Sequence, residues 1–355
     1  MKNYKALILV GFAILSIGTV LIFSATGMFN RFAHDQPEEH GSPLIVMVWE
    51  LAGITADYSS IGPMETVDVV SPTWLHLEDE TGSIRSEIDP AYLAWAHGRG
   101  YQIWALVTNS FDPELTAALL SNPEMRSQFA ADLVDLALEF ELDGLNIDFE
   151  NFHSDYKDHF TALVRELAEL TNKNNLVLSV DVSMISGTEY WSLGYDRQAL
   201  AEAADYIVLM AYDEHYQASP RAGSVASLPW VEQGLTQVLQ EVPAEKLILG
   251  VPFYTRLFEI DESGETPQVL NSWSYSMHRA REIIETYDAR IYYDELSNQH
   301  VAEYENEGLT YRMWLEDSHS MQKRLELVGK YNLAGVAAWR RGLETPEIWD
   351  LFSIN

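Results

Sequence analysis

The sequence predicts an α/β fold: a (β/α)8 TIM barrel with a small α+β insertion between strands 7 and 8, preceded by one N-terminal transmembrane helix. Three observations in the 355 residues support this prediction. Short apolar runs alternate with amphipathic patterns eight times, a long charge-free segment comes first, and one interval interrupts the alternation. A doubly wound open sheet is the alternative fold, but no glycine-rich dinucleotide loop follows any of the apolar runs.

The first segment of the chain is predicted to cross a membrane. No charged residue lies between Lys5 and Arg31, and the strongly apolar part, Ala6–Phe23, is 18 residues long. A helix of about 20 apolar residues spans a hydrocarbon core, whereas the apolar region of a cleaved signal peptide has about 7–15 residues. Because Lys2 and Lys5 precede the segment, the positive-inside rule places the short tail in the cytoplasm and the rest outside.

This pattern divides the chain into three predicted parts. Residues 1–29 are predicted to form the anchor, residues 30–42 a polar linker, and residues 43–355 an extracytoplasmic barrel anchored to the cell membrane. The alternative is a secreted protein, because Ala25-Thr26-Gly27 also suits cleavage of a signal peptide. Under either interpretation the barrel is exported.

Most of the apolar runs are continuous, which is typical of parallel strands covered on both faces. The predicted strands are Leu44–Trp49, Val67–Leu75, Gln102–Thr108, Gly144–Phe149, Leu176–Val182, Tyr206–Tyr212, Leu247–Phe253 and Gly335–Trp339. Between them, apolar residues recur at helical spacing. The clearest predicted helices are Pro123–Phe140, Tyr156–Leu170 and Leu228–Gln240.

The interval between the seventh and eighth strands is much longer than one helical connection. It covers about eighty residues, 254–332. It contains a helical pattern at Ser274–Tyr287 and strand-like pieces at Arg290–Asp294 and Leu309–Leu315. We therefore expect an α+β insertion over residues 257–317 on the rim of the barrel.

The composition excludes several classes of function. The 54 acidic and 22 basic residues give a formal charge of −32, and polyanion binding needs a basic surface, so no nucleic acid partner is expected. The absence of cysteine excludes a disulfide framework, a thiolate nucleophile and a Cys-ligated metal. The ten histidines show no metal-ligand spacing. We expect a monomer that uses no metal and no cofactor.

The segment Leu142–Glu150 (LDGLNIDFE) carries the most informative pattern. Alternate side chains of a strand face opposite sides, so Asn146, Asp148 and Glu150 are predicted to face the barrel interior, where polar groups are costly unless paired or used. Glu150 comes last, at the carboxyl end of the strand, where barrel active sites lie. A buried carboxylate beneath it favours the protonated form of Glu150, which suits a general acid.

Two other interpretations also fit three polar residues on one strand: a structural hydrogen-bonded layer, or a hard-cation site built from amide and carboxylate oxygens. The whole string DGLNIDFE on an apolar strand in the fourth barrel position is far more specific than a lone DxE pattern. It resembles the DGxDxDxE signature of glycoside hydrolase family 18, the chitinase-like barrels.

Further segments resemble this family at matching positions. Tyr206–Asp213 is similar to its sixth strand, which ends in M-x-Y-D, and Gly250–Tyr254 and Gly335–Trp339 are similar to its seventh and eighth strands. The resemblance covers residues 44–352. Segments such as Val70–Trp74 (VSPTW) resemble one subgroup in particular, the peptidoglycan-directed N-acetylglucosaminidases of endospore-forming bacteria, known for spore-cortex lysis and germination.

Two positions depart from the family pattern. Asn146 stands where the family has its first interior Asp, which helps to relay charge to the middle Asp; the spore-type subgroup also accepts Asn there. Thr108–Phe111 (TNSF) stands in place of the SxGG of the third strand. The first departure implies that the pKa values of the remaining carboxyls are tuned in a different way.

The resemblance implies a retaining, substrate-assisted reaction in which the N-acetyl oxygen of the substrate attacks the anomeric carbon. In that scheme Glu150 protonates the leaving oxygen and later activates water. Asp148 orients the acetamide and stabilises the positive intermediate, and Tyr212 donates a hydrogen bond to the acetyl oxygen. These three residues are the predicted catalytic residues.

Further residues are predicted to bind the substrate, as the floor or lining of the sugar subsite or as contacts to sugar hydroxyls. They are Trp339, Met210, Tyr254, Asp213, Asn109, Asn146 and Glu50.

The predicted function is hydrolysis of β-1,4 glycosidic bonds next to N-acetylglucosamine, with peptidoglycan of cortex or cell wall ahead of chitin-like glycans. The alternative is a non-hydrolytic, lectin-like glycan-binding or scaffold protein on the same barrel. Members of the family that lose the acidic Glu become lectin-like. The presence of Glu150 together with Asp148 and Tyr212 therefore favours the enzyme.

Overall fold

The computed structural model describes residues 44–353, apart from residues 54–57, 59–60 and 63. The predicted anchor, residues 1–29, and the predicted linker, residues 30–42, lie outside the described residues. None of the helices in the described part of the chain combines the length and the apolar character that a membrane crossing requires.

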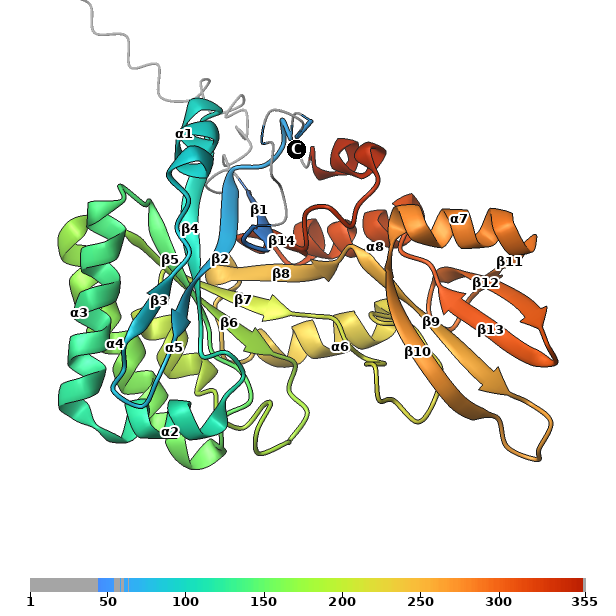
Figure 1. The fold of residues 1–355 in the computed structure, drawn as a ribbon, viewed down its shortest axis with the longest axis horizontal. Coiled ribbons are helices and arrows are strands. Elements are labelled where there is room, and N and C mark those ends of the chain that lie inside the picture. The colour runs from blue at the N-terminus through green and yellow to red at the C-terminus, as the bar shows by residue number, and fades with distance from the viewer. Residues whose placement is uncertain (1–43, 54–57, 59–60, 63, 354–355) are drawn as a thin grey trace, which may run out of the picture. The chain divides into compact units, whose positions relative to one another are not determined.

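Eight parallel strands form a closed barrel, which confirms the barrel part of the predicted fold (Figure 1). The first strand pairs in parallel with both the second and the last, and this double pairing closes the sheet. In their order around the barrel, the strands are β1 (Ile45–Glu50), β2 (Val69–Leu77), β4 (Gln102–Thr108), β5 (Gly144–Asp148), β6 (Val177–Ser183), β7 (Tyr206–Met210), β8 (Leu247–Pro252) and β14 (Gly335–Trp339).

Glycine permits the close approach of strands at the point of closure. Gly335 of β14 is aligned with Ile45 of β1. A Cβ atom at residue 335 would lie 2.1 Å from the Ile45 carbonyl oxygen. Any side chain at this position would therefore separate the two strands that close the barrel.

Amphipathic helices cover the outside of the barrel. They are α1 (Pro90–Gly98), α2 (Pro113–Ser121), α3 (Pro123–Glu139), α4 (Lys157–Asn174), α5 (Arg197–Ala203), α6 (Leu228–Val238) and α8 (Ser318–Lys330), with 3₁₀ turns η2 (Ser154–Tyr156), η3 (Ala244–Lys246) and η4 (Pro346–Phe352). Asp112 and Asn122 cap α2 and α3 by accepting hydrogen bonds from first-turn N–H groups, and a proline follows each cap. The connection between β1 and β2 contains no α-helix among its described residues.

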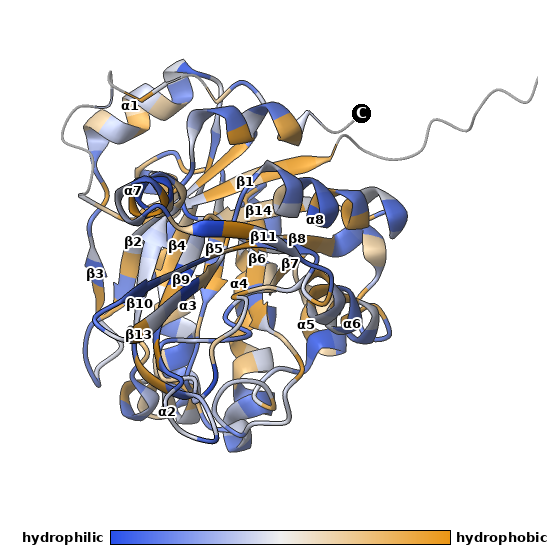
Figure 2. Cartoon of the chain, turned by 90° about the vertical axis from the view of Figure 1, so that its right-hand side faces the viewer, coloured by the Kyte–Doolittle hydropathy of each residue, from blue (hydrophilic) through white to orange (hydrophobic). Residues whose placement is uncertain are grey.

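The apolar side chains of the barrel form two separate layers. One large cluster lies between the strands and the surrounding helices. A smaller cluster fills the barrel interior, and it consists of Met47, Trp49, Val69, Trp104, Leu106, Val208, Ile248 and Ala337. Figure 2 shows the hydrophobic strands enclosed by helices whose outer faces are hydrophilic. The interior cluster therefore forms an apolar base below the carboxyl ends of the strands.

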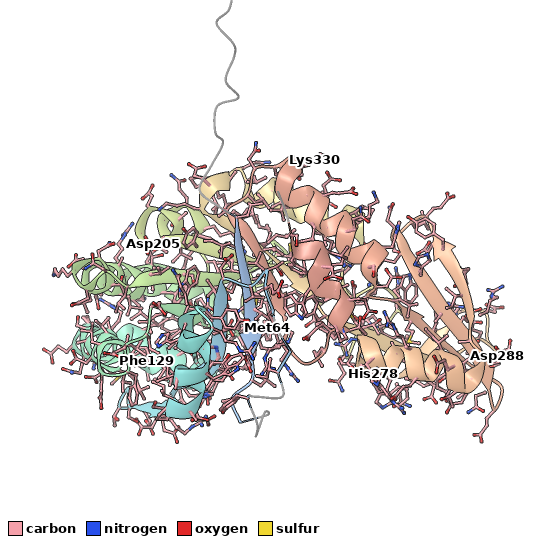
Figure 3. The ribbon with its side chains drawn as sticks, turned by 90° about the horizontal axis from the view of Figure 1, so that it is seen from above. Met64, Phe129, Asp205, His278, Asp288 and Lys330 are labelled. Atoms are coloured by element: carbon pink, nitrogen blue, oxygen red, sulfur yellow. The ribbon has the colours of Figure 1, made fainter. Side chains whose placement is uncertain are left out.

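The insertion is a five-stranded antiparallel sheet with one helix. Its strands pair in the order β10 (Gln268–Ser276), β9 (Tyr254–Asp261), β13 (Leu309–Trp314), β12 (Gln299–Asn306) and β11 (Arg290–Asp294). The helix α7 (Met277–Tyr287) packs on this sheet. In Figure 3, His278 and Asp288 mark α7, which lies on the opposite side of the barrel from Phe129 of α3.

The sheet of the insertion is larger than the sequence pattern predicted. The predicted pieces at 290–294 and 309–315 correspond to β11 and β13. The strands β9, β10 and β12 were not predicted, because polar residues interrupt their apolar pattern. For the same reason α7 begins at Met277 rather than at Ser274, since residues 274–276 belong to β10. A short strand, β3 (Ile84–Ser86), also extends the barrel sheet beside β2.

Candidate active site

A cleft of about 790 Å³ opens at the carboxyl ends of the barrel strands. Strands β1, β5, β6, β7 and β14 contribute side chains to its floor or walls, and β9 and β10 of the insertion form one side. A second cavity of about 740 Å³ lies at the opposite end of the barrel, around Trp104 and Tyr206. Catalytic groups of TIM barrels lie at the carboxyl ends of strands, and only the first of these two cavities contains the predicted carboxyls.

The polar stripe of β5 leads into this cleft as predicted. Asn146 is fully buried, Asp148 is 7% exposed, and Glu150, just beyond the end of β5, is partly exposed. Both carboxyls line the cleft. The alternating residues Ile147 and Phe149 are buried in the layer beneath the helices. The strand therefore presents its carboxyls in one direction and its apolar side chains in the other.

Burial dominates the electrostatics of these carboxyls. It raises the pKa of Asp148 to about 7. Burial also raises the pKa of Glu150 well above its ordinary value, and the carboxyls of Asp148, Asp181 and Asp213 raise it further. The charged form of a carboxyl is disfavoured by desolvation and by like charges nearby. Glu150 is therefore held in its protonated form at a pH where an exposed glutamate is ionised.

Asn146 is the centre of a buried hydrogen-bond network. Its side-chain oxygen accepts from the Trp49 indole N–H at 2.9 Å and from the Ser71 hydroxyl at 3.2 Å. Its NH₂ group donates to Asp181 Oδ1 at 2.6 Å and to the Ser179 hydroxyl at 3.0 Å. The amide thus links β1, β2, β5 and β6 in one layer below the cleft. It lies under Asp148 and does not reach the cleft surface.

Aromatic side chains form the wall opposite the carboxyls. Tyr212 follows β7 and meets Trp49 and Tyr254 edge-on, at ring-centroid distances of 6.4 and 6.3 Å. Trp339 ends β14 and lies 5.8 Å from the Trp49 ring. Met210, the last residue of β7, also lines the cleft. Five of the predicted site residues, on three different strands or their ends, therefore surround one space with Asp148 and Glu150; they are Tyr212, Trp339, Met210, Asp213 and Tyr254.

Asp213 is held at the edge of the cleft by the insertion. The Tyr254 hydroxyl donates to Asp213 Oδ1 at 2.6 Å, and Arg256 Nη2 lies 3.4 Å from the same oxygen. Both partners belong to β9, the first strand of the insertion. The backbone of Asp213 has a φ of +61°, in the left-handed region. The side chain is half exposed and free to contact a ligand through its other oxygen.

Residues 113–344 match the family described as Glycosyl hydrolases family 18. The chain belongs to this family.

This family 18 enzyme is similar to two bacterial proteins in sequence and to one solved structure in fold. It is 25% identical over 308 residues to the "Uncharacterized glycosylase YvbX" of Bacillus subtilis, covering 84% of this chain and 87% of the relative. It is 26% identical over 253 residues to the "Cortical fragment-lytic enzyme" of the same organism, covering 70% of this chain but only 58% of the relative. It also resembles the crystal structure of the C-terminal domain of a putative chitinase from Desulfitobacterium hafniense DCB-2, with a TM-score of 0.76, 26% identity and coverage of 87% and 97%.

Three predicted substrate-binding residues are placed by the structure outside the cleft of the family 18 enzyme: Asn146, in the layer below it, and Asn109 and Glu50. Asn109 is fully buried; its NH₂ donates to the Glu150 backbone oxygen at 2.6 Å and its oxygen accepts from the Glu150 N–H at 3.0 Å. Glu50 is bound by the Tyr92 hydroxyl and the Arg341 guanidinium, and it lines a separate, smaller pocket. Asn109 therefore fixes the backbone of Glu150, and Glu50 neutralises a buried arginine.

Several side chains that line the cleft were not predicted from the sequence, and Asp181, Phe111 and Trp191 are three of them. Asp181 of β6 lies within an apolar run, LSVDVS, where a single acidic residue was a signal that could have been followed. Phe111 and Trp191 lie on the loops after β4 and β6 and are 51% and 44% exposed, with ring centroids 6.4 Å apart. Loop residues carry no periodicity, so their meeting at the mouth of the cleft depends on the tertiary fold.

The described residues contain no group of three or more His, Cys, Asp or Glu side chains with an arrangement that could hold a metal ion.

Proposed function

We propose that this family 18 glycoside hydrolase cleaves β-1,4 bonds next to N-acetylglucosamine in peptidoglycan or chitin-like glycans, by retaining, substrate-assisted catalysis. One observation carries the proposal: the buried Asp148 and the partly exposed Glu150 line the same cleft from one face of β5, and no cationic side chain among the described residues lowers the pKa of either. Such a pair is costly to the folded protein and suits a site where one carboxyl must donate a proton and the other must meet a developing positive charge.

Glu150 is the proposed general acid and base. Its raised pKa keeps the proton needed to protonate the leaving oxygen, and after cleavage the same carboxylate can take a proton from the attacking water. The two hydrogen bonds between Asn109 and the Glu150 backbone fix the start of the loop that carries this side chain. Fixed geometry matters because proton transfer requires the acid to lie within hydrogen-bond distance of the leaving oxygen.

Asp148 and Tyr212 are the proposed partners of the substrate acetamide. Asp148 Oδ1 is buried and has no hydrogen-bond partner among the described residues, so it is available to accept from the acetamide N–H. Burial raises the pKa of the Tyr212 hydroxyl well above its ordinary value. Tyr212 therefore remains a hydrogen-bond donor and can polarise the acetyl group whose oxygen attacks the anomeric carbon.

The aromatic wall is the proposed sugar-binding surface. Trp339 offers a flat face for the pyranose ring, with Met210 and Tyr254 beside it. Pyranose rings present apolar C–H faces that pack on aromatic rings, and their hydroxyls need polar partners. The free oxygen of Asp213 supplies one such partner.

The names of the relatives support both of the proposed substrate classes. One relative is described as cortical fragment-lytic and another as a putative chitinase. The chain spans 58% of the length of the cortical fragment-lytic enzyme, so part of that protein has no counterpart here. We also propose that the enzyme acts outside the cytoplasm, held at the membrane by residues 1–29 or secreted after their removal.

A turnover assay tests the proposed function. The full chain is incubated with chito-oligosaccharides and with purified cortex and vegetative peptidoglycan, and the products are identified by mass spectrometry. We expect N-acetylglucosamine at the new reducing ends, with the β anomer formed first in ¹H NMR. Binding of these glycans without any cleavage would overturn the proposal in favour of a lectin-like protein, and first formation of the α anomer would overturn the retaining reaction.

A further inference from the structure

A third carboxyl lies beside Asp148 on the neighbouring strand. Strands β5 and β6 are parallel, with Asn146 aligned to Ser179 and Ile147 aligned to Val180. Asp148 and Asp181 are the next residues of the two strands, and both line the cleft, so they occupy adjacent positions on the same interior face. Neighbouring strands are about 4.8 Å apart. The two carboxyls are therefore direct neighbours inside the barrel.

The hydrogen bonds around Asn146 determine which hydrogen-bond donors remain available to Asp148 and Asp181. The Trp49 indole N–H can only donate, so the Asn146 atom that it meets at 2.9 Å is the oxygen. The NH₂ group of Asn146 must then point to Asp181 Oδ1, at 2.6 Å. An amide gives up no proton at ordinary pH. Asn146 can consequently fix the orientation of Asp181, but it cannot hold a proton for Asp148.

Asp148 and Asp181 are both removed from solvent, so the ionised form of each is disfavoured. Asp181 is 1% exposed and Asp148 is 7% exposed. Asp148 Oδ1 has no hydrogen-bond partner among the described residues. Two buried carboxyls at this separation cannot both be ionised without a large penalty, whereas one shared proton joins them by a hydrogen bond. Burial, followed by the charge of Asp148, raises the pKa of Asp181 well above its ordinary value.

Within the part of the chain that the structure describes, no cationic side chain forms an ion pair with either carboxyl of this pair. The titratable side chains that interact with this pair are Glu150, Tyr195 and Tyr212. Asp213, Tyr254 and His76 line the same cleft. Arg256 and Arg340 line the cleft and Arg197 lies behind Tyr195. Arg256 pairs with Asp213, Arg340 donates to the Arg341 backbone oxygen, and Arg197 donates to the Ser183 backbone oxygen. A proton is therefore the remaining means of neutralising one of the two carboxyls.

We propose that Asp181 is a positioning residue that shares one proton with Asp148 and keeps it while Asp148 acts as an anion on the substrate. This inference rests on the proposed function. Before the reaction the proton lies between the two carboxyls. When Asp148 accepts from the acetamide N–H and faces the positive intermediate, the O–H bond remains on Asp181 and the hydrogen bond to Asp148 is released. When the product leaves, the proton is shared again, so no proton is exchanged with solvent.

The proposal also explains how the barrel works with an amide at position 146. The carboxyl that the family motif places on β5 is supplied here by β6, across the hydrogen bond from Asn146 Nδ2 to Asp181 Oδ1. The two side chains have the same shape, so the acid and the amide are interchangeable in packing. Only their protonation chemistry distinguishes them, and this makes a swap of the two residues an informative experiment.

The test compares wild type, Asp181→Asn and the swapped double variant Asn146→Asp/Asp181→Asn over the pH profile of kcat and kcat/KM. In Asp181→Asn we expect kcat to fall at least ~10-fold. We expect both limbs of the profile to move to lower pH by about one unit, because a neighbouring carboxyl has been removed. The double variant should recover most of the rate and most of the shift. Thermal unfolding confirms that each variant is folded.

Two results would overturn the proposal: wild-type kcat and pH profile in Asp181→Asn, or a folded double variant that is as slow as Asp181→Asn. A readout without turnover keeps the test independent of the proposed function. Carboxyl ¹³C NMR of wild type should show Asp148 and Asp181 titrating together in two steps, and independent titration of the two would overturn the shared proton. Absence of wild-type turnover with joint titration would instead reject the proposed function alone.

Discussion

Two buried carboxyl sites in this molecule differ in whether a cationic side chain and hydrogen bonds compensate the carboxyl. Where the insertion returns to the barrel, Glu316 is fully buried against Arg324, whose Nη2 lies 2.8 Å from Oε1. Ser320 and Gln299 donate further hydrogen bonds to the same carboxylate, at 2.9 and 3.0 Å. In the cleft, neither Asp148 nor Glu150 has a cationic partner among the described residues, and Asp148 Oδ1 has no hydrogen-bond partner among them.

The difference separates a carboxylate that holds the fold together from carboxyls that can react. Burial raises the pKa of Glu316, but Arg324 and its hydrogen bonds act in the other direction, so its charge is compensated in place. In the cleft nothing opposes burial for Asp148 and Glu150, and their protons are retained to higher pH. Unpaired buried carboxyls lower stability at neutral pH, and they persist where that environment serves chemistry.

The largest expected effect on stability comes from breaking the paired site. Arg324→Met should lower the free energy of unfolding by about 3–5 kcal/mol, because it leaves Glu316 buried without a counter-charge and also removes the hydrogen bonds to the Ala226 backbone oxygen. Urea denaturation measures this loss.

The exposed pair of Lys330 and Glu232 provides the control for that variant. Lys330→Met should cost less than ~1 kcal/mol. Equal losses in the two variants would contradict the assignment of a structural role to the buried pair. In folded Arg324→Met, kcat should remain within about 2-fold of wild type, because Arg324 does not line the cleft.

At the unpaired site, we expect the contribution of Asp148 to the free energy of unfolding to fall as the pH rises. The pKa of Asp148 is raised from 3.8 to about 7, so its contribution to stability is complete below pH 3.8 and is lost as pH rises through 7. Asp148→Asn should therefore flatten the fall in the free energy of unfolding over this window. At pH 8 its Tm should exceed that of wild type, by on the order of 2–4 °C for each kcal/mol recovered.

Thermal unfolding of wild type and Asp148→Asn at several pH values between 3 and 8 would measure this difference. Parallel stability curves for the two proteins would mean that Asp148 is ionised in the folded protein from its ordinary pKa upward. In that case the unpaired site would hold no proton, and the contrast with Glu316 would disappear.

A smaller effect is expected at the mouth of the cleft. Trp191→Ala should raise KM about 2–10-fold for long oligosaccharides, with little change in kcat, because the exposed ring offers packing area and no reacting group. Tyr216→Ala is the matched control, since Tyr216 is 53% exposed but does not line the cleft. An equal change in KM for both variants would exclude a specific role of Trp191.

The barrel was predictable from the sequence because its strands are nearly continuous apolar runs. Strand β4 and strand β14 have the predicted bounds, 102–108 and 335–339, and the other barrel strands differ at their ends by two residues or fewer. The insertion was harder to predict, because one face of its sheet is exposed and polar residues interrupt the pattern. Figure 2 shows this contrast, with β10 largely hydrophilic beside the hydrophobic barrel strands.

The alternation of β5 was sufficient to predict that Asp148 and Glu150 share one face. It did not reveal that Asn109 would bind the Glu150 backbone rather than a sugar, because that contact joins residues 41 positions apart. The role of Asp181 depends on the pairing of β5 with β6, which no single-strand pattern contains. Residues that support the site from neighbouring strands are therefore the part that only the structure provides.

The most direct test of the account is kcat of Glu150→Gln on N-acetylglucosamine oligomers, measured beside Glu316→Gln at a temperature where both are folded. We predict that Glu150→Gln lowers kcat by about 10²–10⁴-fold with no loss of Tm, because only the transferable proton is removed. Glu316→Gln should lower Tm and leave kcat nearly unchanged. A Glu150→Gln variant with wild-type kcat would contradict the account, because catalysis would then not depend on the unpaired carboxyls.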